Sequence, residues 1–95
     1  MPLLALIRPI HLLPGREAEG VAWLNHTEEV RRLAGQINQY VLRGQVDLHD
    51  YQWVQIWQDF ATYDRWRKSP ERSRLADERA RYMTHGPTRS YDVLE

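Results

Sequence analysis

The sequence contains no cysteine, only one phenylalanine and one lysine, and it carries no net charge. Without thiols it cannot form disulfides, thiolate-bound zinc sites or cysteine nucleophiles. Its longest uninterrupted apolar run, Leu3 to Ile7, has five residues, whereas a membrane-spanning helix needs about twenty and the core of an export signal about seven. A neutral balance also argues against a nucleic-acid-binding protein, which is normally basic over one face. We therefore expect a cytoplasmic protein whose partners include neither a membrane nor a nucleic acid.

Tryptophan and tyrosine are the residues in excess. The chain has four tryptophans and five tyrosines among 95 residues, a length that suits one domain over residues 1–95. Large aromatic side chains in a small domain are buried either in the core or against a partner. The sequence therefore predicts an unusually aromatic core or an aromatic interface.

Hydrophobic periodicity predicts an alternation of strands and helices. The pattern favours strands over Leu3–Leu13, Ile37–Gly44, Tyr51–Gln58 and Thr88–Leu94, with helices over Arg16–Ala34, over Phe60–Lys68 and from Ser69-Pro70 to near Gly86-Pro87. Gly35 is suited to end the first helix, Asp59 and Ser69 to cap the later ones, and Pro9 would confine the first strand to an edge or a bulge. This order, βαββαβ, predicts an α+β fold of the ferredoxin-like type, with a four-stranded antiparallel sheet.

Only one face of such a sheet is covered by helices. In the third strand, Trp53, Gln55 and Trp57 share one face, and Val54 and Ile56 share the other. We expect the valine and isoleucine to face the helices, which leaves the two tryptophans on the open face. An open aromatic face predicts a homodimer in which two sheets pack together. The alternative turns Trp53 and Trp57 toward the helices as ordinary core.

The segment from Val54 to Pro70, VQIWQDFATYDRWRKSP, resembles the antibiotic biosynthesis monooxygenase (ABM) family. The shared features are a third strand that ends in a tryptophan, a helix shortly after it, and a Ser-Pro before the next helical turn. The turn Pro14-Gly15 and the pair Ala34-Gly35 fit as well. This resemblance implies a dimeric α+β barrel formed through the sheet face by two copies of the chain.

The resemblance also implies the activities to be considered. Members include cofactor-independent oxygenases of polycyclic phenols and quinols, and haem-degrading enzymes. Trp66 matches the helical tryptophan of the haem-degrading branch. However, Ile7 and Arg8 stand where that branch has an asparagine, and Ala76 stands where it has the histidine that would bind iron. We therefore expect no cofactor and no metal, with haem as the minor alternative.

A cofactor-independent oxygenase needs an aromatic cavity and a few polar groups that orient a phenolate. The residues that the resemblance and the strand pattern suggest for substrate binding are Tyr40, Trp53, Gln55, Trp57 and Trp66, and the catalytic candidates are Asn38, Trp66 and Arg8. The expected substrate is a small aromatic, hydrophobic or polyketide-type molecule. The alternative is a non-catalytic dimeric barrel that binds a hydrophobic ligand or a protein partner.

The remaining polar residues suggest no other site. The four histidines (His11, His26, His49 and His85) show no metal-ligand spacing. Six arginines on the last helical stretches alternate with acidic residues, so we expect a solvated, locally neutralised face. RNA-binding domains share the predicted topology, but their third strand carries glycine and basic residues, which YQWVQIWQ lacks.

Overall fold

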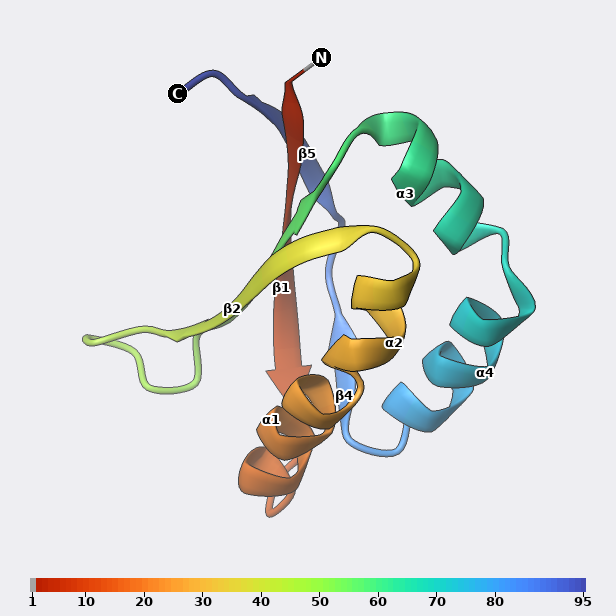
Figure 1. Ribbon diagram of the computed structural model, residues 1–95. Helices are drawn as coiled ribbons and strands as arrows, with labels where there is room; N and C mark the ends of the chain where they lie inside the picture. Colours follow the sequence, from red (N-terminus) through yellow and green to blue (C-terminus); the bar gives the residue numbers. More distant parts are fainter. Residues whose placement is uncertain (1) are drawn as a thin grey trace.

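The computed structural model describes residues 2–95, which form one antiparallel sheet with helices on one side (Figure 1). The strands are β1 (Leu3–Leu12), β2 (Gln36–Arg43), β3 (Tyr51–Trp57), β4 (Met83–His85) and β5 (Arg89–Val93). The helices are α1 (Glu17–His26), α2 (Glu28–Leu33), α3 (Phe60–Arg67) and α4 (Pro70–Arg79). The sheet order is β2-β3-β1-β4, and β5 also pairs with β1. This is the predicted ferredoxin-like α+β architecture.

The strand predicted over Thr88–Leu94 is present as β5, and an additional strand, β4, precedes it because α4 ends at Arg79 and not near Gly86. A tight turn follows α4, and Met83 enters the core with only 2% of its surface exposed. β4 and β5 then pair with opposite ends of the same edge of β1. The expected extension of the last helix to Gly86-Pro87 was therefore wrong.

Pro9 lies in the middle of the sheet and not at an edge, since β1 has partners on both sides. Its carbonyl oxygen accepts a hydrogen bond from the Gly86 N–H at 2.9 Å. In a strand, the N–H and C=O of one residue point to the same side, so the missing donor of Pro9 faces the interruption between β4 and β5. A central strand tolerates this proline because no ladder hydrogen bond is lost there.

The first helix is divided at Thr27, where a single helix over Arg16–Ala34 was expected. The Thr27 hydroxyl donates to the Trp23 carbonyl at 2.8 Å, and the Leu24 carbonyl accepts from the side chains of Arg31 and Gln39. Side chains therefore provide hydrogen-bond donors for two of the last carbonyl groups of α1. Beyond α2, Gly35 adopts a φ of 119°, as predicted for a residue that ends a helix.

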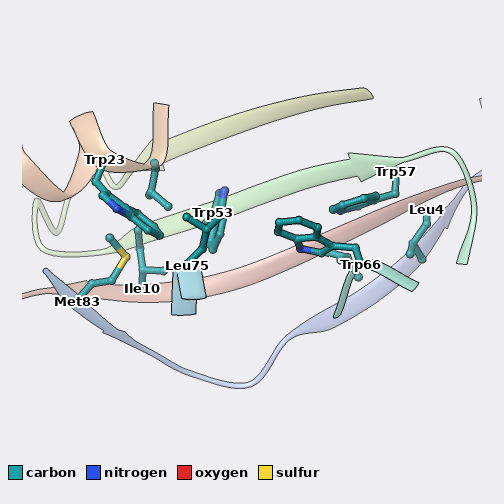
Figure 2. Packing of buried hydrophobic residues seen from close by; sticks show 10 residues of the cluster. Leu4, Ile10, Trp23, Trp53, Trp57, Trp66, Leu75 and Met83 are labelled. Atoms are coloured by element: carbon teal, nitrogen blue, oxygen red, sulfur yellow. The ribbon is translucent and has the colours of Figure 1, made fainter. Parts of the chain in front are cut away.

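Two caps fix the entry into α3 and α4, as the sequence predicts. Asp59 accepts a hydrogen bond from the Thr62 N–H at 2.8 Å, and Ser69 accepts one from the Arg72 N–H at 3.2 Å. Pro70 occupies the first turn of α4, where its missing N–H costs nothing. The caps orient the two helices so that Trp66 and Leu75 point at the sheet (Figure 2).

The orientation of β3 is opposite to the one expected. Trp53, Gln55 and Trp57 are buried beneath the helices, with 3%, 5% and 0% of their surface exposed. Figure 2 shows Trp53 and Trp57 among Trp23, Trp66 and Leu75. Val54 and Ile56 occupy the other face. The helices supply too few large apolar side chains of their own, and the tryptophans of β3 complete the core.

Candidate functional site

The candidate site is a small cavity between the sheet and the helices. It has a volume of about 20 Å³, enough for about one water molecule. Most of its lining is aromatic or basic, and the lining residues are Arg8, Trp23, Arg31, Trp53, Gln55, Tyr63, Trp66, Arg72, Leu75, Ala76 and Arg79. The lining therefore comes from β1, β3 and all four helices.

The alternation of β1 and β3 places the sheet residues of the cavity. Leu4, Leu6, Arg8 and Ile10 are the buried residues of β1, so the arginine occupies a position that periodicity assigns to the core. It lies opposite Trp53 in the register of β1 and β3. The Arg8 side chain donates from Nε to the Thr88 hydroxyl at 2.8 Å, which ties the loop between β4 and β5 to the cavity.

Arg8, Arg31, Arg72 and Arg79 form an arginine cluster around this cavity. The guanidinium carbons of Arg8, Arg31 and Arg79 lie 5.4, 4.9 and 5.9 Å from the ring centroid of Trp53. A tryptophan face attracts cations at such distances. One indole ring therefore contacts three buried cations.

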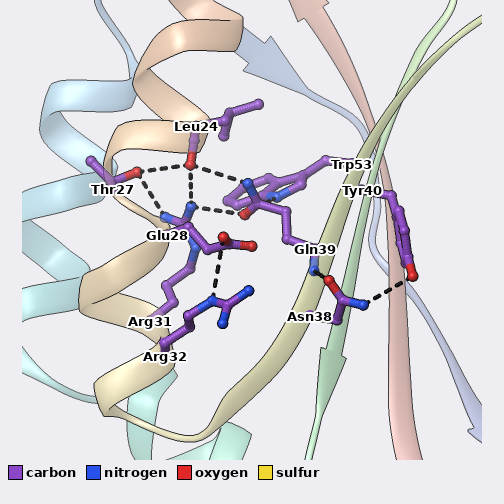
Figure 3. Close-up of polar contacts among 9 residues, drawn as sticks. All are labelled: Leu24, Thr27, Glu28, Arg31, Arg32, Asn38, Gln39, Tyr40 and Trp53. Atoms are coloured by element: carbon purple, nitrogen blue, oxygen red, sulfur yellow. Dashed lines mark hydrogen bonds and ion pairs between the residues drawn. The ribbon is translucent and has the colours of Figure 1, made fainter.

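Arg31 is held by hydrogen bonds within the protein (Figure 3). Its Nη2 donates to the Leu24 carbonyl at 2.7 Å and to Oε1 of Gln39 at 2.9 Å, and its Nη1 donates to the Thr27 hydroxyl at 3.0 Å. The same Gln39 oxygen accepts from the indole N–H of Trp53 at 3.0 Å. A cation is also favourable at the C-terminal end of α1. Arg31 thus fixes α1, α2 and β2 around Trp53.

Burial and mutual repulsion weaken the proton affinity of the cluster. Burial, followed by the charges of Arg8 and Arg72, lowers the pKa of Arg79 to about 10. Burial also lowers the pKa of Arg31 to about 10 and lowers that of Arg8. A guanidinium with a pKa near 10 is still charged at neutral pH. The cavity is therefore strongly positive.

His85, on β4, is influenced by the same charges. Its hydrogen bond to the Gly86 carbonyl raises the pKa of the imidazole, but burial and the charges of the nearby arginines lower it by more. The pKa of His85 is therefore below its ordinary value. The charge of the arginine cluster therefore contributes to the lowered pKa of His85.

The predicted site residues fall into two groups. Arg8, Trp53, Gln55 and Trp66 line the cavity. Trp57 lies just behind it, with its indole N–H bonded to Oε1 of Gln55 at 2.9 Å and its ring centroid 6.1 Å from that of Trp66.

Tyr40 and Asn38 are not brought to the cavity. Tyr40 pairs with Val54, and Asn38 with Ile56, on the face that the helices leave open. The Asn38 amide donates to the Tyr40 hydroxyl at 2.9 Å (Figure 3). The structure therefore separates these two residues from the other candidates by the thickness of the sheet.

Arg31, Arg72 and Arg79 were not among the site residues predicted from the sequence. The arginines of α4 were expected on a solvated face, which holds for Arg74, paired with Glu78 at 3.6 Å, but not for Arg79, of which 9% is exposed. A signal was present, since Arg72, Leu75 and Arg79 recur at helical spacing and thus share one face. This spacing was not taken as evidence of burial, because arginine side chains were expected to be exposed to solvent.

An open groove lies beside the cavity, between α2 and the start of α4. This outer groove has a volume of about 410 Å³ and is lined by Val30, Leu33, Ala34, Arg65, Trp66, Ser69 and Glu71. Trp66 lines both spaces. The cavity and the outer groove are therefore adjacent at Trp66.

Two further observations concern metals and membranes. Within residues 2–95, no group of three or more histidine, aspartate or glutamate side chains is arranged to hold a metal ion. No helix in this part of the chain is long and apolar enough to cross a membrane.

No protein-family model and no curated protein sequence matches the chain. Solved structures do match its fold. SnoaB, a cofactor-independent oxygenase from Streptomyces nogalater, superposes with a TM-score of 0.83 at 14% identity, covering 100% of this chain and 96% of SnoaB. A "Putative antibiotic biosynthesis monooxygenase" from Bordetella bronchiseptica gives 0.81 at 18% identity, with 100% and 98% coverage. PA3566 from Pseudomonas aeruginosa gives 0.72 at 20% identity, with 100% and 97% coverage.

At these identities the likeness establishes the fold, and activity has to be argued from the site itself. The ferredoxin-like α+β fold that the sequence predicts is confirmed over the described chain. The protein has the ferredoxin-like α+β fold of SnoaB and of the Bordetella bronchiseptica structure named above.

Proposed function

We propose that the protein is a cofactor-independent monooxygenase-like enzyme that acts on a small aromatic or polyketide-type substrate. The observation that carries this proposal is the pair of adjacent spaces at Trp66. The small cavity between sheet and helices supplies polar donors beside Trp23, Trp53 and Trp66, and the outer groove of about 410 Å³ is large enough for an aromatic ring. SnoaB, which has the same fold, is described as a cofactor-independent oxygenase.

The proposed chemistry starts from a phenol that loses its proton. A phenolate is electron-rich enough to pass an electron to dioxygen without a metal or flavin. Net oxidation of a CH2 group to a carbonyl consumes one O2: one oxygen atom enters the product, and the other leaves as water with the two hydrogens. The protein has to bind the phenolate, orient it and keep water out.

The cavity residues suit these tasks. Arg8 provides a buried positive charge, which lowers the pKa of a bound phenol. Oε1 of Gln55 is occupied by Trp57, so the amide nitrogen of Gln55 is available as a donor to the phenolate oxygen. The indoles of Trp53 and Trp66 form apolar walls that limit access of water. Together these groups would stabilise negative charge on the reacting ring.

The open face of the sheet supports a homodimer. Alternation along the strands gathers apolar side chains there: Leu3, Ala5, Ile7, Tyr40, Leu42, Val54, Ile56, Tyr91 and Val93. Half of the surface of Tyr40 and of Leu42 is exposed, 51% and 50%. A contiguous apolar sheet face is usually covered by another layer. A second copy supplies a matching layer, as in dimeric α+β barrels.

Oxygen uptake with a dihydroxyanthrone tests the catalytic proposal, after subtraction of the spontaneous oxidation rate. We expect enzyme-dependent uptake of one O2 per product anthraquinone. Trp66→Phe should lower the rate about tenfold or more, because the wall beside the reacting ring recedes. Phe60→Leu, on the same helix but 56% exposed, is the control and should leave the rate unchanged. No uptake across a panel of phenols and quinols would overturn the proposal.

Light scattering tests the dimer. The chain has a mass of 11.4 kDa, so the proposed dimer has twice that mass. Replacing Leu42 by aspartate places a charge on the open face and should yield monomers. A wild-type protein that is monomeric at micromolar concentration would refute the dimer and leave the catalytic proposal standing.

A further inference from the structure

The arginine cluster holds more positive charge than the protein neutralises. Arg8 and Arg79 have 8% and 9% of their surface exposed. Among residues 2–95, neither forms an ion pair with a carboxylate. Buried charges in proteins are normally paired, because transfer of an isolated ion out of water is costly. Within the described residues, Arg8 and Arg79 therefore lack an anionic partner, whereas the charge of Glu28 acts favourably on Arg31.

The acidic residues near the cavity are engaged elsewhere. Glu78 accepts from the indole N–H of Trp23 at 3.2 Å and pairs with Arg74 on the outer side of α4. Glu28 pairs with Arg32 at 3.3 Å, and Asp64 pairs with Arg67 and Lys68. None of these carboxylates forms an ion pair with Arg79. The neutralising group has to come from a ligand.

Unused donors surround the cavity. Arg31 donates three hydrogen bonds from its terminal nitrogens, and its buried Nε has no partner among the described residues. Arg8 donates from its Nε to Thr88 and also interacts with the Tyr63 side chain. The guanidinium of Arg79 makes no hydrogen bond with any residue from 2 to 95. The terminal nitrogens of Arg8 and Arg79 can thus donate into the cavity, beside the half-buried Arg72. Guanidinium groups bind carboxylates through two parallel hydrogen bonds.

The size of the two spaces constrains the ligand. The cavity of about 20 Å³ accepts only a compact group, while the outer groove of about 410 Å³ accepts a larger body. Val30, Leu33 and Ala34 give this groove an apolar wall. Trp66 lines both spaces, so they are adjacent at this residue. The ligand that fits has a small anionic end and an apolar, ring-sized body.

The number of positive charges at the cavity indicates that the substrate carries a second negative group. A phenolate neutralises one of the three charges of Arg8, Arg72 and Arg79. We propose that the substrate is an aromatic acid, whose carboxylate binds to Arg8, Arg72 and Arg79 while its ring lies against Trp66. This inference rests on the proposed function, because it assigns a substrate class to the same site.

Isothermal titration calorimetry with naphthoate and naphthamide tests this inference. The two probes have nearly the same shape, but only naphthoate is charged at neutral pH. We expect naphthoate to bind at least about tenfold more tightly than naphthamide, in line with the strength of charge-assisted hydrogen bonds. Equal affinities, or binding of neither probe, would overturn the proposal. Inorganic phosphate is the third probe; if it binds as tightly as naphthoate, the cluster is a site for small inorganic anions and the proposal is wrong.

Variants locate the binding energy. Arg79→Met should remove most of the preference for naphthoate, and Arg8→Met provides a second, independent removal of charge. Arg74→Met, on the exposed side of the same helix, is the matched control and should change the affinity less than about twofold. An unchanged preference in both cluster variants, with their folding verified by circular dichroism, would refute the assignment.

Kinetics separate this inference from the proposed function. Oxygen uptake is compared for dihydroxyanthrone and for its carboxylated derivative. A lower KM for the acid, lost in Arg79→Met, supports both statements. Equal KM values with clear turnover would refute the carboxylate site and retain the oxygenase. Selective binding of naphthoate without turnover of any phenol would retain the carboxylate site and refute the oxygenase.

Discussion

Replacing Arg79 by methionine is expected to stabilise the protein in the absence of ligand. Arg79 is buried, makes no ion pair within residues 2–95, and lies near the other positive charges of the cluster. Methionine retains the length and much of the packing of the arginine stem, and it removes the charge. Removal of an uncompensated buried charge favours the folded state.

The size of the effect follows from the proton affinity of Arg79. Burial and the charges of Arg8 and Arg72 lower its pKa to about 10, which corresponds to an upper limit of about 3 kcal/mol against the charged form. Contact with water in the cavity reduces this penalty to about 1–2 kcal/mol. Loss of the contact with Trp53, 5.9 Å from the guanidinium, costs about 0.5 kcal/mol. The free energy of unfolding should therefore rise by about 1 kcal/mol.

Urea unfolding, followed by tryptophan fluorescence at one fixed protein concentration, measures this change. Arg74→Met is the control, and its free energy of unfolding should differ from that of wild type by less than about 0.5 kcal/mol. Excess naphthoate should reverse the order, because it stabilises only the protein that binds it. A cluster variant that is less stable than wild type by about 1 kcal/mol or more, beside a neutral control, would show that Arg79 is compensated in the folded protein.

Two other perturbations test the geometry and the charge of the fold. Gly35→Ala should lower the free energy of unfolding by about 2–4 kcal/mol, because φ is 119° and a Cβ would meet the Thr62 side chain. Gly15→Ala should lower it by only about 1 kcal/mol, because φ is 79° but the space around a Cβ is open. Equal losses of the two variants in urea unfolding would contradict this reasoning. Folding lowers the pKa of His85, so the unfolded chain takes up this proton first and stability should fall as the pH drops below about 6.5. His85→Gln should flatten that pH dependence, and in an NMR titration Arg79→Met should raise the pKa of His85; an unchanged pKa would show that the arginine charge does not reach it.

Local patterns in the sequence predict much of the fold. Asp59, Ser69 and Gly35 act at helix ends through their own side chain or backbone freedom, so their roles are visible in a window of a few residues. The alternation in β3 likewise predicts that Trp53 and Trp57 share a face. Which face that is depends on the helices, whose contribution to the core only the assembled fold shows.

The candidate site was predicted only in part, because its chemistry depends on exceptions to burial rules. Arg8 and Trp66 were identified from the family resemblance and the strand pattern. Arg31 and Arg79 are cations at core positions. When an arginine falls on the apolar side of a predicted helix, periodicity alone does not show whether the arginine is buried or the buried side has been assigned wrongly. Tyr40 is of a residue type that often binds ligands, but the register of β2 places it on the side of the sheet that faces away from the cavity.

The cavity and the open face lie on opposite sides of the same strand, β1, so a dimer formed on one side would affect ligand binding on the other. Along β1, Arg8 points to the cavity, while Ile7 and Pro9 point to the open face. A second copy packed on that face would restrain the backbone of β1 and therefore the donors of Arg8. Restrained donors bind at a lower entropic cost. Dilution into monomers should thus weaken the binding of an aromatic acid on the other side of the strand.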